Sequence, residues 1–365
     1  MSFRDFQGNS ETVTRLREML QRDRFPHAVI LSGPQGSGKY TLAQMLAKAM
    51  NCLHPKTASD GLLDDCGECA NCTRIAEADD LEARCAEAEE ARENLRETDR
   101  KETRLFIQTH SDVLVIPPDP PQLMIKVDQV RRVTETIYYR PTEGGRRVYI
   151  ITSSAFMKEA ANALLKVLEE PPEFATIFLL TSNPGELLPT IRSRSITFRL
   201  APLPAGEVEK YLATERRELA PEQRALVARL SGGALGRAKT FDLAAYTLAR
   251  ADALSLLRAA TGSGDHSSLF RTTETYRAGA DGRTKTDLLV RTLYSLLEDI
   301  TFLRSGTPEL VANTDIQAEL KRMAEQVSFP WIEAAARELA AFESGMRRNL
   351  LRSLALDSMV TSLER

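Results

Sequence analysis

The sequence predicts an α/β domain with a parallel sheet, followed by a C-terminal region that is entirely helical. Up to about residue 200, apolar strand-like runs alternate with helical patterns, as in sheets whose strands run parallel. From about residue 203 onward the pattern is helical throughout, with leucines at the three- to four-residue spacing of an amphipathic helix. These leucines are Leu288, Leu289, Leu293, Leu296 and Leu297. A chain of 365 residues has room for two or three domains, and we expect three, at 1–202, 203–243 and 244–365.

Five apolar runs are expected to form the strands of the sheet. They cover residues 28–32, 112–116, 147–151, 176–181 and 195–200. Chain-breaking residues lie close to each of the last four, at Pro117-Pro118, Gly144-Gly145, Asn183-Pro184 and Pro202.

The bulk composition is that of an ordinary soluble protein, with 42% hydrophobic and 27% charged residues. A net charge of −3 argues against a chain that grips nucleic acid by itself through a broad basic surface. No apolar run approaches the length of a membrane span, and the Met-Ser-Phe-Arg-Asp start opens no signal sequence. We therefore expect a cytoplasmic protein without a membrane partner, in which five cysteines favour metal binding over disulfides.

A phosphate-binding loop follows the first expected strand. Residues 33–40 read Gly-Pro-Gln-Gly-Ser-Gly-Lys-Tyr and precede a helical pattern that starts at Tyr40. The glycines let backbone N–H groups surround a phosphate at a helix N-terminus, and Lys39 adds a positive charge. The expected nucleotide-binding residues are Gly33, Gly36, Ser37, Gly38, Lys39 and Tyr40.

This loop lacks the groups that normally hold magnesium. Its last position should be Ser or Thr, and the phenol of Tyr40 cannot reach a metal ion held close to the loop. Thr41 has a hydroxyl, but it is rotated about 100° around the helix. The strand at 147–151, which should end in a metal-binding carboxylate, is followed by Thr152-Ser153-Ser154-Ala155. We expect a site that binds ATP or ADP at most, without Mg²⁺ and without hydrolysis.

Four cysteines predict a structural zinc site. Cys66-x2-Cys69-x2-Cys72 suits a tight turn around one ion, and thirteen residues separate Cys52 from this run. Four thiolates match tetrahedral Zn²⁺ with no open coordination position. The expected ligands are thus Cys52, Cys66, Cys69 and Cys72, with His54 and Cys85 as alternatives to Cys52 as the fourth ligand.

The segment 76–106 interrupts the α/β pattern. Its 31 residues contain no Gly or Pro, and they include eleven acids and six bases. Pairs such as Glu97 and Lys101 at i,i+4 support an exposed helix. A solvated helix or helical hairpin is expected here, and an arm that docks a partner is the alternative.

Several motifs together resemble one family. The first is Pro26-His27-Ala28, and the second is the cysteine cluster. The others are a helix at 160–170 that Pro171-Pro172 ends and Ile191-Arg192-Ser193-Arg194. The chain thereby resembles the AAA+ clamp-loader subunits of bacterial DNA polymerase III, and most of all their delta-prime members. The likeness is good over residues 1–240 and fainter at Asn313-Thr314-Asp315.

The resemblance implies an architecture and a set of partners. A RecA-like AAA+ domain with an inserted zinc module would be followed by a small helical lid and an all-helical collar that joins five subunits. The partners would be the gamma/tau and delta subunits, with the sliding clamp and primer–template DNA reached through the complex. The chain would then be a non-hydrolysing stator within a DNA-directed DNA polymerase, whose nucleotidyltransferase chemistry belongs to another subunit.

Site roles follow from the resemblance only where residues match. Arg194 occupies the position of an arginine finger that acts in trans on a neighbour's ATP, and Ser195 replaces the usual cysteine after it. Arg237 matches the lid arginine that senses nucleotide, and Thr181 or Asn183 stands where a first sensor would be. The Cys52–Cys66 gap is longer than is usual in the family, and the 76–106 insertion is unfamiliar.

Three other functions remain open. An active gamma/tau-type clamp-loader ATPase or a small-molecule P-loop kinase would each need the missing magnesium ligands. A zinc-module nucleic-acid-binding protein would show tight, salt-dependent DNA binding on its own. Basic residues flank the third strand and either contact DNA phosphates or form a solvated face, which is the interpretation that we favour. They are Arg131, Arg132, Arg140, Arg146 and Arg147.

Overall fold

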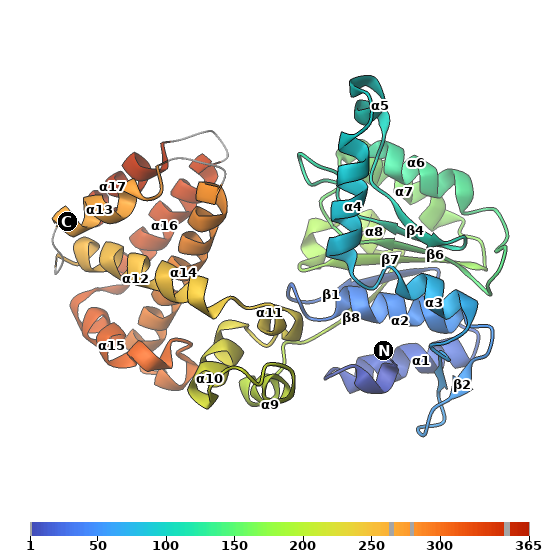
Figure 1. The fold of residues 1–365 in the computed structure, drawn as a ribbon, viewed down its shortest axis with the longest axis horizontal. Coiled ribbons are helices and arrows are strands. Elements are labelled where there is room, and N and C mark those ends of the chain that lie inside the picture. Colours follow the sequence, from blue (N-terminus) through green and yellow to red (C-terminus); the bar gives the residue numbers. More distant parts are fainter. Residues whose placement is uncertain (1, 263–265, 278–280, 347–350, 365) are drawn as a thin grey trace. The chain divides into compact units, whose positions relative to one another are not determined.

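The computed structural model describes residues 2–262, 266–277, 281–346 and 351–364, and the chain forms two units (Figure 1). The N-terminal unit comprises Met1–Leu203 with Ala234–Gly236, and the C-terminal unit comprises Pro204–Gly233 with Arg237–Arg365. The first unit is mixed α/β, and the second has only helices among its described residues. The predicted fold class is therefore confirmed. The division into three domains stays a prediction.

A six-stranded sheet forms the centre of the N-terminal unit, with the strand order β4-β5-β6-β7-β1-β8. Five strands are parallel, and β4 at one edge is antiparallel to β5. The strands are β1 (Ala28–Ser32), β4 (Ile107–His110), β5 (Val113–Ile116), β6 (Arg147–Ile151), β7 (Ala175–Thr181) and β8 (Ile196–Arg199). All five predicted strands are present. The sequence-based prediction missed β4 and a separate hairpin of β2 (Lys56–Thr57) and β3 (Leu63–Asp64).

Helices cover both faces of the sheet (Figure 1). Successive residues of a strand point to opposite faces, so Val29 and Leu31 of β1 enter one core and Ile30 enters the other. Because both faces are buried, the central strands are continuous apolar runs rather than alternating ones. The helices of this unit are α1 (Ser10–Gln21), α2 (Lys39–Asn51), α3 (Ala70–Ala76), α4 (Leu81–Glu93), α5 (Glu97–Glu102), α6 (Val127–Thr136), α7 (Lys158–Glu169) and α8 (Pro189–Arg192).

The C-terminal unit is a set of packed helices around an apolar core. The core includes Leu289, Leu293, Leu296 and Leu297 of the predicted amphipathic helix, whereas Leu288 is only partly buried. The helices are α9 (Ala205–Glu215), α10 (Pro221–Leu230), α11 (Leu235–Lys239, which begins in the N-terminal unit), α12 (Leu243–Ala260), α13 (His266–Glu274), α14 (Asp281–Arg304), α15 (Gln317–Gln326), α16 (Phe329–Met346) and α17 (Arg352–Leu363). Along the described ranges, none of the helices has the length and apolar character that a membrane crossing requires.

A buried polar network explains the Asn313-Thr314-Asp315 motif. Arg250 donates two hydrogen bonds to the Asp315 carboxylate, at 2.8 and 2.6 Å, and a third to Asn313 Oδ1 at 3.0 Å. Tyr246 donates to the same Asn313 oxygen, and Asp299 accepts from both nitrogens of Asn313. The motif thus fixes the loop before α15 onto α12 and α14.

Candidate nucleotide and metal sites

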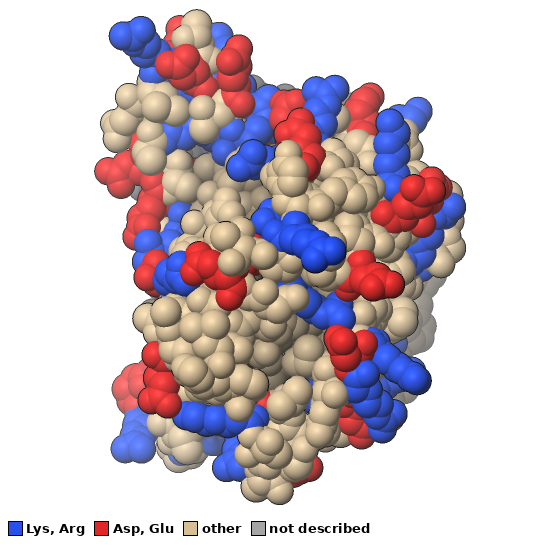
Figure 2. Space-filling view, turned by 90° about the vertical axis from the view of Figure 1, so that its right-hand side faces the viewer, with Lys and Arg blue, Asp and Glu red and all other residues tan. Residues whose placement is uncertain are grey.

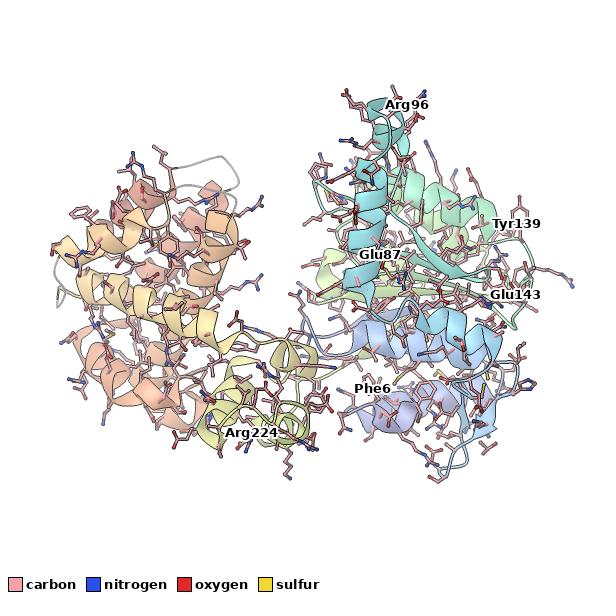
Figure 3. All side chains as sticks on the ribbon, viewed as in Figure 1. Phe6, Glu87, Arg96, Tyr139, Glu143 and Arg224 are labelled. Carbon is pink, nitrogen blue, oxygen red and sulfur yellow. The ribbon has the colours of Figure 1, made fainter. Side chains whose placement is uncertain are left out.

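The phosphate loop connects β1 to α2, and its glycines are required by its backbone. Gly36 and Gly38 have φ of 80° and 85°, a left-handed conformation that side chains disfavour. A Cβ at Gly38 would also lie 2.9 Å from the ring of Phe6, which is labelled in Figure 3. The Gly36 carbonyl accepts a hydrogen bond from the Gly236 amide at 2.8 Å. Sequence and conformation therefore agree on a loop that can close around a phosphate.

Two side chains of the loop suit an anion. Lys39 Nζ donates to the carbonyls of Gly33 and Pro34, at 2.7 and 2.6 Å, and burial lowers the pKa of Lys39 to about 8. Ser37 Oγ is buried and has no hydrogen-bond partner among the described residues. An unsatisfied hydroxyl beside a partly desolvated ammonium group fits a phosphate, which would accept from both.

Tyr40 is occupied by the chain itself. Its hydroxyl donates to the Ala78 carbonyl at 2.5 Å and accepts from Gln44 Nε2 at 2.6 Å. Burial raises the pKa of this phenol above its ordinary value, so it stays neutral. A neutral phenol used in this way offers no ligand to a metal ion at the loop.

Tyr40 is the first of three side chains on one face of α2 that hold the start of the 76–106 insertion. Gln44 Nε2 also donates to the Ala78 carbonyl, at 3.3 Å. Lys48 forms an ion pair of 2.8 Å with Asp79, and its side chain is 4% exposed. Residues 40, 44 and 48 are spaced i, i+4, i+8, which places them in one row along a helix. The helix that begins at the phosphate loop therefore also carries the insertion.

No carboxylate follows β6 directly. The Thr152 amide donates to the Ile116 carbonyl, and Ser153 Oγ accepts from the Ala155 amide. Ser154 Oγ donates to Glu186, which comes from the loop after β7. An acidic side chain thus reaches this edge of the sheet from a different strand, and the sequence-based prediction did not identify it. Glu186 is exposed and bound to Ser154.

The first-sensor candidates, Thr181 and Asn183, make hydrogen bonds within the turn that follows β7. Thr181 Oγ1 accepts from the Asn183 amide and donates to the Asn183 carbonyl. The Asn183 side chain caps the short 3₁₀ helix Pro184–Glu186 by accepting from the Gly185 amide. These contacts shape the loop after β7, and a sensor role stays a prediction.

Arg194 lies just after α8, at the surface of the N-terminal unit. Its guanidinium donates to Glu169 at 3.0 Å and to the Thr190 carbonyl at 3.2 Å. The side chains of this ion pair are 36% and 54% exposed, so water competes for both partners. The pair joins two of the motifs that carry the resemblance, because Glu169 ends α7 before Pro171-Pro172. Arg237 belongs to the C-terminal unit, where it lines a cavity together with Arg291. A nucleotide-sensing role for Arg237 stays a prediction.

The structure brings four cysteine sulfurs together. The Sγ atoms of Cys52, Cys66, Cys69 and Cys72 all lie within 4.8 Å of one another. Cys52 and Cys69 Sγ are 4.0 Å apart, and Cys66 and Cys72 Sγ are 3.9 Å apart. Four thiolates about 2.3 Å from one tetrahedral Zn²⁺ would be separated by about 3.8 Å, so the cluster fits zinc closely. His54 and Cys85 are not part of this group.

The local chain favours ionised sulfur at Cys69, whereas burial raises the pKa of Cys52 and of Cys72. Burial opposes ionisation of Cys69, but amide donors and neighbouring thiols outweigh it and lower the pKa of Cys69 to about 6. The Cys72 amide donates to Cys69 Sγ, and the Cys69 amide donates to Cys66 Sγ. Amide-to-sulfur bonds of this kind stabilise thiolates, the form that binds a metal.

A hairpin accounts for the long Cys52–Cys66 gap. Strands β2 and β3 lie between the two cysteines. Arg17 of α1 binds this hairpin to the rest of the unit. Arg17, whose side chain is 4% exposed, pairs with Asp60 at 2.5 Å and donates to the carbonyls of Leu62 and Leu63. The sequence-based prediction missed this support. The Asp60-Gly61 dipeptide, a frequent hairpin turn, was the signal that could have revealed it.

The arginines that flank β6 are mostly paired within the unit. Arg131 pairs with Asp128, Arg146 with Asp23, and Arg147 with Asp112, at 3.2, 3.0 and 3.3 Å. Figure 3 labels Tyr139 and Glu143, which lie near these arginines in the sequence. Figure 2 views the molecule from the side on which these two residues lie, and it shows basic and acidic side chains interspersed. This distribution is typical of a solvated face rather than of a track for phosphates.

The insertion contains two helices, α4 and α5, and whether it docks a partner stays an open alternative. Helix α4 has no buried residue, and Figure 3 labels Glu87 on α4 and Arg96 at the turn before α5. Arg92 anchors the far end of α4 through an ion pair of 3.0 Å with Asp119, whose side chain is 4% exposed. The insertion is therefore held at both ends of α4, with an exposed acidic and basic surface between them.

Comparisons with known proteins identify similar chains. A family model described as DNA polymerase III, delta subunit, matches residues 8–204. The tau/gamma subunit of DNA polymerase III from Haemophilus influenzae is 30% identical over 213 residues, 58% of this chain and 25% of that protein. The tau subunit from Escherichia coli is 30% identical over 269 residues, 72% of this chain and 34% of that protein. The delta' subunit from Pseudomonas aeruginosa is 31% identical over 214 residues, 58% of this chain and 54% of that protein. The chain thus spans between a quarter and about half of the length of these relatives.

Proposed function

The chain belongs to the DNA polymerase III delta subunit family of AAA+ clamp-loader proteins, and we propose that it acts there as a delta-prime-like stator. In this proposal it holds no magnesium and hydrolyses no ATP of its own. It completes a cytoplasmic complex with gamma/tau and delta subunits that loads the sliding clamp onto primer–template DNA. ATP or ADP can occupy its phosphate loop without turnover, and Cys52, Cys66, Cys69 and Cys72 hold a structural zinc ion.

One observation carries the proposal. The hydroxyl of Tyr40, at the position where a P-loop ATPase has its magnesium ligand, is bound to the Ala78 carbonyl and to Gln44. The absence of a carboxylate directly after β6 supports the same conclusion independently. Arg194 supports a role in trans, because its guanidinium is held only by a weak surface ion pair with Glu169 and one hydrogen bond to the Thr190 carbonyl.

The test uses the reconstituted clamp-loader complex with its DNA-stimulated ATPase as readout. Arg194→Ala should lower ATP turnover by about 10³-fold at the neighbouring site that this subunit serves, while the complex still assembles. Arg192→Ala, an exposed arginine two residues earlier, is the matched control and should leave turnover unchanged. Normal turnover in the Arg194→Ala complex would defeat the proposed role.

A second candidate is an active gamma/tau-type ATPase, favoured by the 30% identity to tau/gamma relatives. The purified chain alone separates the two candidates. The stator shows no Mg²⁺-dependent ATP hydrolysis in isolation, whereas a motor subunit does, and a Lys39→Ala variant would abolish that activity.

A further inference from the structure

A cavity of about 210 Å³ lies within the C-terminal unit and is lined by two arginines. Arg237 comes from α11, and Arg291 comes from α14. Burial lowers the pKa of Arg237, and the positive charge of Arg291 lowers it further. Like charges that share one cavity repel each other, and an anion between them would remove that cost.

No described carboxylate lies within ion-pair distance of either arginine, although Arg291 also lines another hollow together with Asp287 and Glu343. Neither Arg237 nor Arg291 makes an ion pair or a side-chain hydrogen bond with any described residue. Other arginines of this unit do find carboxylates, such as Arg250 with Asp315 at 2.6 Å and Arg258 with Glu319 at 2.5 Å. The contrast marks Arg237 and Arg291 as available guanidinium groups.

The acidic residue on the cavity wall, Asp242, already makes a hydrogen bond within its own helix. Asp242 caps α12, because its carboxylate accepts from the Ala245 amide at 2.9 Å. The Thr292 hydroxyl on the wall already donates to the Leu288 carbonyl at 2.7 Å, and Ser295 Oγ accepts from Asn313 Nδ2 at 3.5 Å. The two guanidinium groups are therefore the charged donors of the cavity wall.

Size and charge define the ligand. A volume of about 210 Å³ equals that of about seven liquid waters, which is room for a phosphate or diphosphate. It is below the range of about 300–1,000 Å³ that is usual for pockets that enclose larger ligands such as a whole nucleotide. Guanidinium forks match the oxygens of such anions in a bidentate way. We propose that the C-terminal unit binds a small phosphate-bearing anion between Arg237 and Arg291, at a site separate from the phosphate loop.

The experiment is calorimetric titration of the full chain with pyrophosphate and with inorganic phosphate, at matched ionic strength. All titrations use a Lys39→Ala background, which weakens binding at the phosphate loop. We expect one pyrophosphate per chain. Arg237→Gln and Arg291→Gln should each weaken binding by about tenfold or more, as expected for loss of a charge-assisted hydrogen bond.

Arg322→Gln is the matched control, because Arg322 is an exposed arginine of α15 whose Nε donates to the Ala318 carbonyl of its own helix. It changes the net charge equally and should leave the affinity as it is. Equal affinity in the Arg291→Gln and parent chains would overturn the proposal, and so would the absence of binding by both anions. If the anions fail to bind but Arg291→Gln blocks assembly with other clamp-loader subunits, the occupant is an acidic side chain of a partner, which also overturns it.

Discussion

Tyr40→Phe isolates the hydroxyl that binds α2 to the start of the insertion. The substitution keeps the ring and removes two hydrogen bonds, of 2.5 Å to the Ala78 carbonyl and of 2.6 Å from Gln44. The Ala78 carbonyl and Gln44 Nε2 still have each other at 3.3 Å, so neither group is left without a partner. The expected cost is therefore the net value of about one to two hydrogen bonds, about 1–2 kcal/mol in the free energy of unfolding of the N-terminal unit.

The two units can be followed separately during urea unfolding. Trp331, the single tryptophan of the chain, lies in α16 of the C-terminal unit and donates to the Leu363 carbonyl. Its fluorescence reports that unit, whereas far-UV circular dichroism reports both. Tyr40→Phe should shift the dichroism transition to lower urea and leave the fluorescence transition in place.

Tyr138→Phe serves as the control for this experiment. Its hydroxyl lies 3.5 Å from the Glu170 carbonyl, and the side chain is exposed, so its loss should change stability by less than about 0.5 kcal/mol. The reasoning is refuted if Tyr40→Phe unfolds at the same urea concentration as the parent, or if the tryptophan transition moves with it.

Three further predictions concern the loop, the metal cluster and the helical unit. Because the pKa of free Lys39 is lowered to about 8, its ammonium group is present below that pH and is lost above it. Affinity for ADP should thus fall as the pH rises from 7 to 9.5 in calorimetric titrations, and Lys39→Arg, which stays charged, should remove the fall. Elemental analysis should show that Cys52→Ser loses the structural zinc, about one ion per chain, and that Cys85→Ser keeps it. Arg250→Met should lower the free energy of unfolding of the C-terminal unit by about 2 kcal/mol, seen in tryptophan fluorescence, because Asp315 loses its arginine partner and Asn313 Oδ1 keeps only the hydrogen bond from Tyr246.

The central strands were predictable because a strand that is buried on both faces has apolar residues at nearly every position. β1, β6 and β7 are continuous apolar runs, and each lies between two strands of the sheet. β4 was missed because Ile107-Gln108-Thr109-His110 is a short edge strand with mixed polarity. The strands of the hairpin, at two residues each, are too short to show any periodicity.

The site was predictable where residue type alone decides the chemistry. Spacing identified Cys66, Cys69 and Cys72, whereas the position of Cys52 depends on the path of the chain through the hairpin. The defect at Tyr40 was visible as a wrong side chain, but its partner was not. The Ala78 carbonyl is a backbone group 38 residues away, and any residue there would supply it.

The row formed by Tyr40, Gln44 and Lys48 links the residue at the end of the phosphate loop to the stability of the insertion. A substitution that placed Ser or Thr at position 40 would remove the two hydrogen bonds of the phenol, so that Gln44 and Lys48 alone would hold the start of the insertion. A magnesium-binding hydroxyl at position 40 would therefore lower the stability of the N-terminal unit without restoring ATP hydrolysis. Hydrolysis would also require a carboxylate directly after β6, where the chain has none.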